Sequence, residues 1–171
     1  EEVARESDLL TFHTPLDSTT HHLADASLLA QLKPECLVIN ASRGPVVDNE
    51  ALLQAGLACA LDVWEEEPQL NRLLLAHAVV ATPHVAGYTA QGKANASAIA
   101  ARILSEEFSL PLANWYPHTV TPPSPRPISW NELCRTIDAH CDLRAESQIL
   151  KQHPEQFEAL RDGYCYREEY F

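Results

Sequence analysis

The chain has 171 residues, of which 46% are hydrophobic and 21% charged, enough for one ordinary globular domain or two small ones. Its 24 acidic and 12 basic residues give a formal net charge of −12, so we expect no surface that neutralises nucleic-acid phosphates. No apolar run approaches the roughly 18 residues of a membrane-spanning helix, and no basic and then apolar leader opens the chain. We therefore expect neither a nucleic-acid nor a membrane partner.

Two further features concern the origin of the chain. It contains no methionine and opens at Glu1 within a helix-like stretch, so we expect a piece of a longer protein. Its five cysteines include no C-x-x-C pair, and they support neither a disulfide framework nor a zinc cluster. Reduced thiols favour a cytoplasmic location.

Up to about Pro83, short apolar runs alternate with helical stretches, a rhythm typical of an α/β fold with a buried parallel sheet. The apolar runs predict strands over Leu9–Phe12, Leu37–Asn40, Cys59–Val63 and Ala78–Thr82. Helical spacing predicts helices over Ala24–Leu32 and Asp48–Gln54, the second with Asp48 as its N-cap.

The second half of the chain has a different organisation. An alanine-rich stretch over residues 89–108 predicts one long helix, and half of the 12 prolines then predict an extended linker over 111–128. Ser129 stands three residues before Glu132, the spacing of a capping box at a helix start. We expect an α/β segment over residues 1–88 and a connecting helix over 89–110. A linker over 111–128 and a small appended α+β domain over 129–171 are expected to follow.

Each predicted strand ends in a polar, turn-like signature. Ligands of open α/β sheets bind outside the carboxyl ends of the strands, so we expect these segments to form one rim. The rim comprises His13 to Pro15, Asn40 to Gly44, Asp62 to Pro68 and Thr82 to Tyr88. It offers an arginine, a glutamate and a histidine, a set that can bind an anion and move a proton.

Three rim segments read N-A-S-R-G, L-D-V-W-E-x-E-P and T-P-H-x-A-G-Y, in that order. This order resembles the catalytic half of the NAD-dependent D-2-hydroxyacid dehydrogenases, strongly over residues 8–104 and more loosely over 129–171. The resemblance implies a partial Rossmann-like, doubly wound parallel sheet, with residues 1–88 as the C-terminal half of an NAD-binding domain. It also implies NAD as cofactor, a small phosphorylated 2-hydroxy acid as substrate, and a homodimer formed through a partial dimerisation domain at 129–171.

The resemblance assigns roles to individual residues. Arg43 would clamp the substrate carboxylate with its planar guanidinium, and His84 would take the hydroxyl proton as hydride leaves for the nicotinamide. Glu67, 17 positions before His84, would hold the imidazole in one tautomer. Tyr88 would offer a hydroxyl to the substrate. The cofactor would be lined by Thr14, Ala41, Ser42, Arg43, Asp62 and Gly87, and no metal is expected.

Each of these residues also has a structural interpretation. Glu65 to Glu67 form an acidic run, and such runs usually mark a solvated turn. Arg43 could pair at the surface, and Asp62 could simply end its strand. Three further places contain histidine without ligand spacing, and they are interpreted as surface or packing residues with no assigned function: His21-His22, His140-Cys141 and His153.

The chain departs from the family in two places. It contains no G-x-G motif for a cofactor pyrophosphate, and the segment from Asp48 to Asp62 is several residues shorter than the family's helix, turn and strand. Two alternatives therefore stay open. One is another D-2-hydroxyacid dehydrogenase, such as a phosphoglycerate dehydrogenase or a glyoxylate reductase, and the other is a non-catalytic remnant or dimerisation module.

Overall fold

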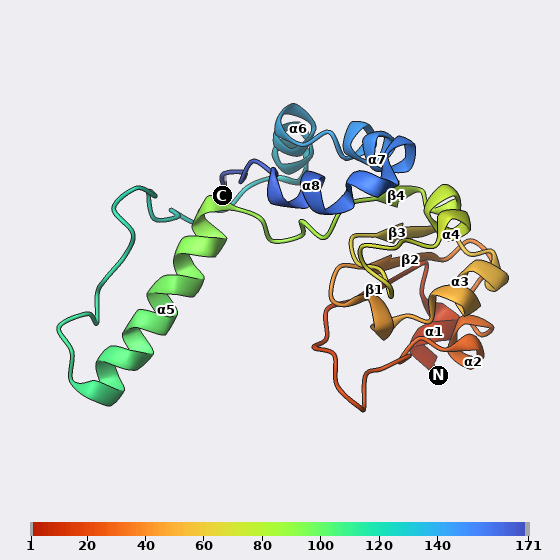
Figure 1. Cartoon of the computed structure of the whole chain (residues 1–171), viewed down its shortest axis with the longest axis horizontal. Coiled ribbons are helices and arrows are strands. Elements are labelled where there is room, and N and C mark those ends of the chain that lie inside the picture. Colours follow the sequence, from red (N-terminus) through yellow and green to blue (C-terminus); the bar gives the residue numbers. More distant parts are fainter. Residues whose placement is uncertain (1, 170–171) are drawn as a thin grey trace. The chain divides into compact units, whose positions relative to one another are not determined.

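A computed structural model describes residues 2–169 of the chain, and a four-stranded parallel sheet organises its first part (Figure 1). The strands, in spatial order, are β1 (Leu9–Phe12), β2 (Leu37–Asn40), β3 (Cys59–Leu61) and β4 (Val80–Ala81). Leu9 pairs with Leu37, Val38 with Cys59 and Ala60 with Val80. The predicted parallel α/β sheet is confirmed, and β1 and β2 have the predicted bounds. The other two strands are shorter than predicted, and β4 pairs only with β3.

Short helices precede and connect these strands. They are α1 (Glu2–Glu6), α2 (Ala26–Leu29), a 3-10 turn η1 (Gly44–Val46), α3 (Asn49–Ala55) and α4 (Arg72–His77). The predicted N-cap of α3 is confirmed, since the Asp48 carboxylate accepts a hydrogen bond from the amide of Ala51. The helix ends at Gly56, whose φ of +66° is a left-handed conformation that glycine adopts at little cost. The α2 helix is shorter than predicted, because Ala24 instead bridges to Val47.

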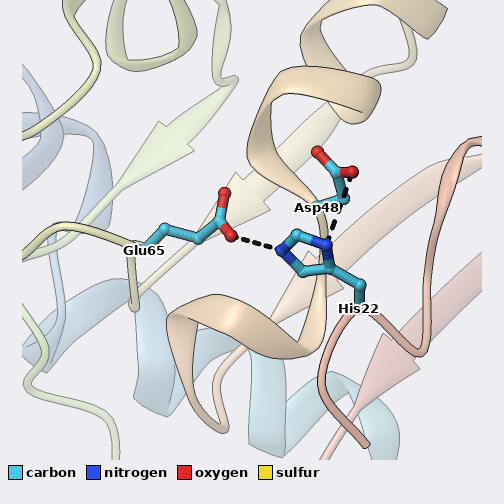
Figure 2. A group of neighbouring side chains, drawn as sticks. All are labelled: His22, Asp48 and Glu65. Atoms are coloured by element: carbon cyan, nitrogen blue, oxygen red, sulfur yellow. Dashed lines mark hydrogen bonds and ion pairs between the residues drawn. The ribbon is translucent and has the colours of Figure 1, made fainter.

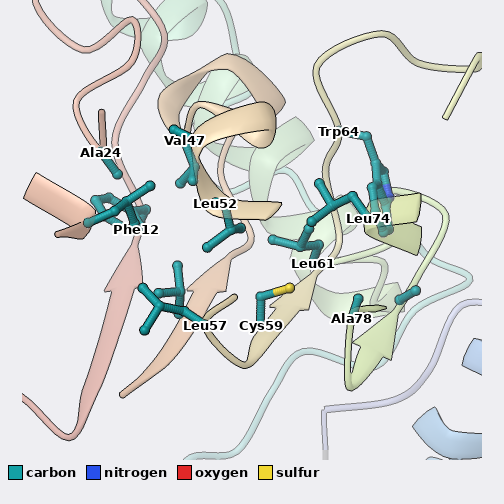
Figure 3. Close-up of a cluster of buried hydrophobic side chains, with 14 of the residues drawn as sticks. Phe12, Ala24, Val47, Leu52, Leu57, Cys59, Leu61, Trp64, Leu74 and Ala78 are labelled. Atoms are coloured by element: carbon teal, nitrogen blue, oxygen red, sulfur yellow. The ribbon is translucent and has the colours of Figure 1, made fainter. Parts of the chain in front are cut away.

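The apolar core lies among the strands and the helices α3 and α4 (Figure 3). Phe12 and Leu61 come from strands, Leu52 from α3 and Leu74 from α4, and none of them is more than 6% exposed. Burial of each such side chain stabilises the fold by roughly 1.5–3 kcal/mol relative to exposure. The core therefore fixes the sheet whose carboxyl edge carries the polar rim.

Two later helices complete this compact unit, which consists of residues up to Ala86 together with Leu143–Gly163. They are α7 (Leu143–Gln152) and α8 (Phe157–Asp162), joined by the 3-10 turn η2 (Pro154–Gln156). Leu150 and Phe157 are almost completely buried in the core. The α7 helix runs along the outer side of β4, where the Ser147 hydroxyl accepts a 2.9 Å bond from the Ala81 amide and the Lys151 ammonium donates to the Ala78 carbonyl.

The second compact unit consists of Gly87–Asp142 and the residues from Tyr164 onward. Its helices are α5 (Ala90–Phe108) and α6 (Trp130–His140), and the segment between them contains neither helix nor strand. The hydroxyls of Thr89 and Ser129 cap α5 and α6, in agreement with the predicted helix starts. Its only β contact among the described residues is an isolated bridge between Thr89 and Arg167. None of the described helices is both long and apolar enough to cross a bilayer.

Candidate active site

The loop after β2 is built on the buried side chain of Asn40. Its Oδ1 accepts hydrogen bonds from the Ser42 amide at 3.1 Å and the Ser42 hydroxyl at 2.8 Å, and its Nδ2 donates to the Arg43 carbonyl at 2.9 Å. Asn40 is fully buried, so these bonds within the loop satisfy an amide that has no access to water. They fix the backbone of residues 41–44 and leave the Arg43 side chain exposed at the rim.

Gly44 allows the loops after β2 and β3 to touch. A Cβ atom at this position would lie 1.9 Å from the carbonyl oxygen of Trp64, a distance that no side chain permits. Trp64 is itself buried, and its indole N–H donates a 3.2 Å bond to the Thr82 carbonyl. Arg43, in the loop after β2, is therefore held next to the loop after β3, which carries Glu65 to Glu67.

The carboxylate of Asp62 organises the loop that carries His84. It accepts bonds from the Thr82 hydroxyl at 2.6 Å, the Val85 amide at 2.8 Å and the Ala86 amide at 3.0 Å. The Asp62 backbone carbonyl also accepts a 2.8 Å bond from the His84 amide. These four bonds surround His84, whose φ of +57° is a left-handed conformation that a non-glycine residue keeps only where its surroundings determine it.

His84 and Glu67 form a close, partly buried pair. The Nδ1 atom of His84 lies 2.7 Å from Oε2 of Glu67, while Oε1 of Glu67 accepts a 2.9 Å bond from the Trp64 amide. The two side chains are 26% and 18% exposed. An ionised carboxylate only accepts hydrogen bonds, so Nδ1 carries a proton, and in the neutral form of the ring Nε2 has the lone pair. The pair can therefore take a proton at Nε2 and stabilise the imidazolium that results.

A cavity of about 690 Å³ lies beside the rim loops after β1 and β2. His13, Thr14, Ala41, Ser42 and Arg43 line it together with Pro15 and Leu16. The hydroxyl of Thr14 is buried and has no hydrogen-bond partner among the described residues. An unpaired buried hydroxyl is costly, and a polar ligand in this cavity would supply its missing partner.

The first unit contains seven of the nine predicted site residues, namely Thr14, Ala41, Ser42, Arg43, Asp62, Glu67 and His84. Of these, the structure joins Glu67 directly to His84, and Thr14, Ala41, Ser42 and Arg43 share one cavity. The shortened segment before Asp62 does not prevent these contacts. Gly87 and Tyr88 belong to the second unit. There the centres of the Tyr88 and Tyr166 rings are 5.6 Å apart, and the Lys93 ammonium lies 4.0 Å from the centre of the Tyr88 ring.

One group of side chains in the first unit has no role predicted from the sequence. His22 and Glu65 are in contact, with 2.5 Å between Nε2 and Oε1, and Asp48 faces the other nitrogen of the ring (Figure 2). His22 and Glu65 are 43 positions apart, so no local spacing indicates the contact. The interpretation of Glu65 as part of a merely solvated turn is wrong, because this side chain is only 25% exposed and accepts a bond from the Asn49 amide.

Comparison with known families identifies the class of this fold and site. Residues 1–86 match the family of the D-isomer specific 2-hydroxyacid dehydrogenase, NAD binding domain, and the chain belongs to that family. The predicted resemblance to the NAD-dependent D-2-hydroxyacid dehydrogenases is thereby confirmed. The proteins of this class are oxidoreductases that act on the CH–OH group of small hydroxy acids.

Individual relatives narrow the comparison. The chain is 38% identical over 180 residues to an erythronate-4-phosphate dehydrogenase of Bacteroides thetaiotaomicron, and the match covers 99% of this chain and 51% of that protein. The chain thus spans about half the length of the curated relatives it matches. A holo D-mandelate dehydrogenase of Rhodotorula graminis is 30% identical, with a TM-score of 0.58 over 72% of this chain and 38% of that one. A D-isomer specific 2-hydroxyacid dehydrogenase of Xanthobacter autotrophicus, complexed with NADPH and MES, is 33% identical, with a TM-score of 0.54 over 65% of this chain and 48% of that one.

Proposed function

We propose that this chain is the nicotinamide-binding half of an enzyme that oxidises 4-phospho-D-erythronate to 2-oxo-3-hydroxy-4-phosphobutanoate, with NAD as cofactor, in the biosynthesis of pyridoxal 5'-phosphate. The named relatives support the substrate. The single observation that carries the proposal is the 2.7 Å contact between Nδ1 of His84 and Oε2 of Glu67 at the carboxyl edge of the sheet.

The chemistry follows from the protonation of this pair. With Nδ1–H held by Glu67, Nε2 of His84 accepts the proton of the C2 hydroxyl as hydride leaves C2. The Glu67 carboxylate stabilises the imidazolium formed in this step. The Arg43 guanidinium binds the substrate carboxylate through its two parallel N–H groups, which fixes C2 relative to the base. Tyr88 would donate its hydroxyl to the substrate.

The residues beside the cavity fit a dinucleotide, which accepts the hydride when it is bound. Thr14 has an unpaired buried hydroxyl, and Ala41, Ser42 and Arg43 offer the backbone of a fixed loop. Three of the roughly four acceptor positions of the Asp62 carboxylate are occupied, which leaves one for the carboxamide of the nicotinamide. Gly87, which belongs to the second unit and has a φ of +77°, would line the cofactor without crowding it, because it carries no side chain.

The test is an assay of the protein encoded by the complete reading frame that contains this sequence. We expect NADH formation from 4-phospho-D-erythronate, and a loss of about 10²–10⁴-fold in kcat for His84→Gln, the usual contribution of a general base. His153→Gln, an exposed histidine paired with Glu155, is the matched control and should retain full turnover.

Three results would contradict the proposal in different ways. Full turnover in His84→Gln would remove His84 as the base. A preference for 3-phosphoglycerate or glyoxylate would favour another D-2-hydroxyacid dehydrogenase. Failure of the unaltered protein both to bind NADH and to turn over any of these substrates would favour a non-catalytic module.

We also propose that the protein is a homodimer, joined through the appended residues 129–171, and that it resides in the cytoplasm. The α6 helix supports the first proposal, because none of its residues is buried and Trp130 is 75% exposed. Trp130→Glu should shift the sedimentation coefficient toward that of a monomer, and an unchanged value would contradict this interface. The five free cysteines support a reducing compartment, which fractionation of cells producing the protein would test.

A further inference from the structure

The imidazole of His22 lies between two carboxylates that come from different parts of the first unit (Figure 2). Its Nε2 lies 2.5 Å from Oε1 of Glu65, and its Nδ1 lies 3.6 Å from Oδ2 of Asp48. The three side chains are between 25% and 34% exposed, so water screens their charges incompletely. No step of the proposed function uses any of them.

A histidine and two carboxylates can bind a metal ion, and this is the one such group within residues 2–169. The orientation of the ring argues against an ion shared by all three, because an ion takes the lone pair of a single ring nitrogen. Here each nitrogen faces a different carboxylate. The ring instead bridges the two carboxylates, with a hydrogen bond to Glu65 at one nitrogen and a longer contact to Asp48 at the other.

Glu65 is fastened to the start of α3 as well as to His22. Its second oxygen, Oε2, accepts a 2.9 Å bond from the Asn49 amide, and the Asn49 side chain accepts a 3.4 Å bond from the Glu65 amide. Asn49 is buried and donates to the Val47 carbonyl. Since Asp48 is the N-cap of α3, both carboxylates that face His22 are tied to the same helix end.

His22 is equally well fixed from its own side. Its amide donates a 2.7 Å bond to the Pro45 carbonyl, and Ala24 exchanges backbone bonds with Val46 and Asp48. Its φ of +50° is a left-handed conformation, which a residue with a side chain keeps only where surrounding contacts determine it. The ring is therefore held between the carboxylates by its backbone as well as by its hydrogen bond to Glu65.

Glu65, one member of this group, lies in the same loop as Glu67. Glu65 and Glu67 are separated by one residue, so their Cα atoms are at most about 7 Å apart. Glu67 also accepts a bond from the amide of Trp64, the residue before Glu65. A shift of Glu65 would therefore move the carboxylate that holds Nδ1 of His84.

We propose that His22 and Glu65 are positioning residues, and that the His22 imidazole, placed between Glu65 and Asp48, fastens the loop after β3 to α3 so that Glu67 meets His84. The meaning of this for catalysis rests on the proposed function. The effect on His84 itself can be measured on this chain without substrate or cofactor.

The experiment is NMR spectroscopy of the histidine rings in the ¹⁵N-labelled chain, which reports the tautomer of each ring and the solvent exchange of its N–H protons. The Nδ1 proton of His84 should be visible and protected in the unaltered chain. In His22→Gln we expect it to exchange about tenfold faster, the factor expected from the loss of one hydrogen bond to a charged group. Glu65→Gln keeps an oxygen for the Asn49 amide but loses the charge, so a smaller increase is expected.

His153→Gln is the matched control, because it removes an exposed histidine beside a glutamate in the same unit and should leave His84 unchanged. Protection of the amides in the sheet shows whether each variant is folded. If His22→Gln unfolds, the exchange rate of the His84 Nδ1 proton in the Glu65→Gln variant tests the proposal instead. Folded variants with unchanged exchange at His84 would overturn the positioning role and leave the proposed function intact, whereas failure of the complete protein to turn over would refute only the latter.

Discussion

The sheet unit and the unit that contains α5 differ in how their apolar residues are used. In the first, side chains from β1, β3, α3, α4, α7 and α8 are packed into one core, and the rim loops are tied to it by buried Asn40 and Asp62. In the second, α5 has 19 residues but buries only Gln91, Ala94 and Ser105, while Ile99, Ile103 and Leu104 are at least half exposed. The difference shows that seven of the nine predicted site residues belong to the unit that folds around its own core.

The largest expected difference in stability is between a substitution in the core of the sheet unit and one on the exposed side of α5. Leu52→Ala removes a fully buried side chain and should lower the free energy of unfolding by about 3 kcal/mol. Ile103→Ala removes a side chain that is 56% exposed and should change it by less than about 0.5 kcal/mol. Urea denaturation followed by circular dichroism measures both. Equal losses would mean that α5 is buried against a partner in solution.

A smaller effect is expected where the core meets the rim. Asp62→Asn leaves one acceptor oxygen for three donors in a buried position, so it should cost about 2 kcal/mol of stability. Hydrogen exchange at the Val85 and Ala86 amides should become faster. Asp8→Asn, whose side chain is 86% exposed beside Lys33, is the matched control. Unchanged protection of Val85 would contradict the role given to Asp62.

Removal of a helix cap should cost about 1 kcal/mol of helix stability in either unit, but the consequences for the rest of the protein should differ between the units. The Asn71 side chain accepts bonds from the Leu73 and Leu74 amides at the start of α4, so Asn71→Ala should destabilise the whole sheet unit. Ser129→Ala removes the cap of α6, which contributes nothing to a core, so only the local helix content should fall. Residue-resolved hydrogen exchange distinguishes the two. A global effect of Ser129→Ala would show that α6 is coupled to the sheet.

The rates at which buried and exposed cysteines react compare the two units without any substitution. Burial raises the pKa of the Cys59 thiol to about 11, so at pH 8 only about one molecule in a thousand carries the reactive thiolate. Burial also raises the pKa of Cys36. Cys165 is exposed and should react with iodoacetamide first, followed long afterwards by the two buried thiols. Mass spectrometry gives the order, and equal rates in 6 M urea are the control.

The features that the sequence predicts here are local ones. The bounds of β1 and β2 follow from continuous apolar runs, and the caps Asp48 and Ser129 follow from side chains that bond to amides three residues away. The site residues Arg43, Glu67 and His84 could be named from motif order, but the Glu67 to His84 contact is a tertiary feature.

Contacts between residues far apart in the sequence leave no local pattern from which they could be predicted. The bond between His22 and Glu65 depends on two loops meeting beside α3, and no periodicity encodes it. In the same way, no pattern in the sequence indicates that α7 packs against the sheet unit. Packing of Leu150 into the core of the sheet unit is decided by tertiary fit.

The placement of α7 along β4 also decides how the sheet can grow. An edge strand exposes a row of N–H and C=O groups that can template pairing with another chain. At β4 the Ser147 hydroxyl and the Lys151 ammonium occupy such groups on Ala81 and Ala78, so this border is blocked. Within the described residues β1 pairs only with β2, and Leu9 at its start is 50% exposed. Any added strand, native or aggregating, would therefore have to join the sheet at β1.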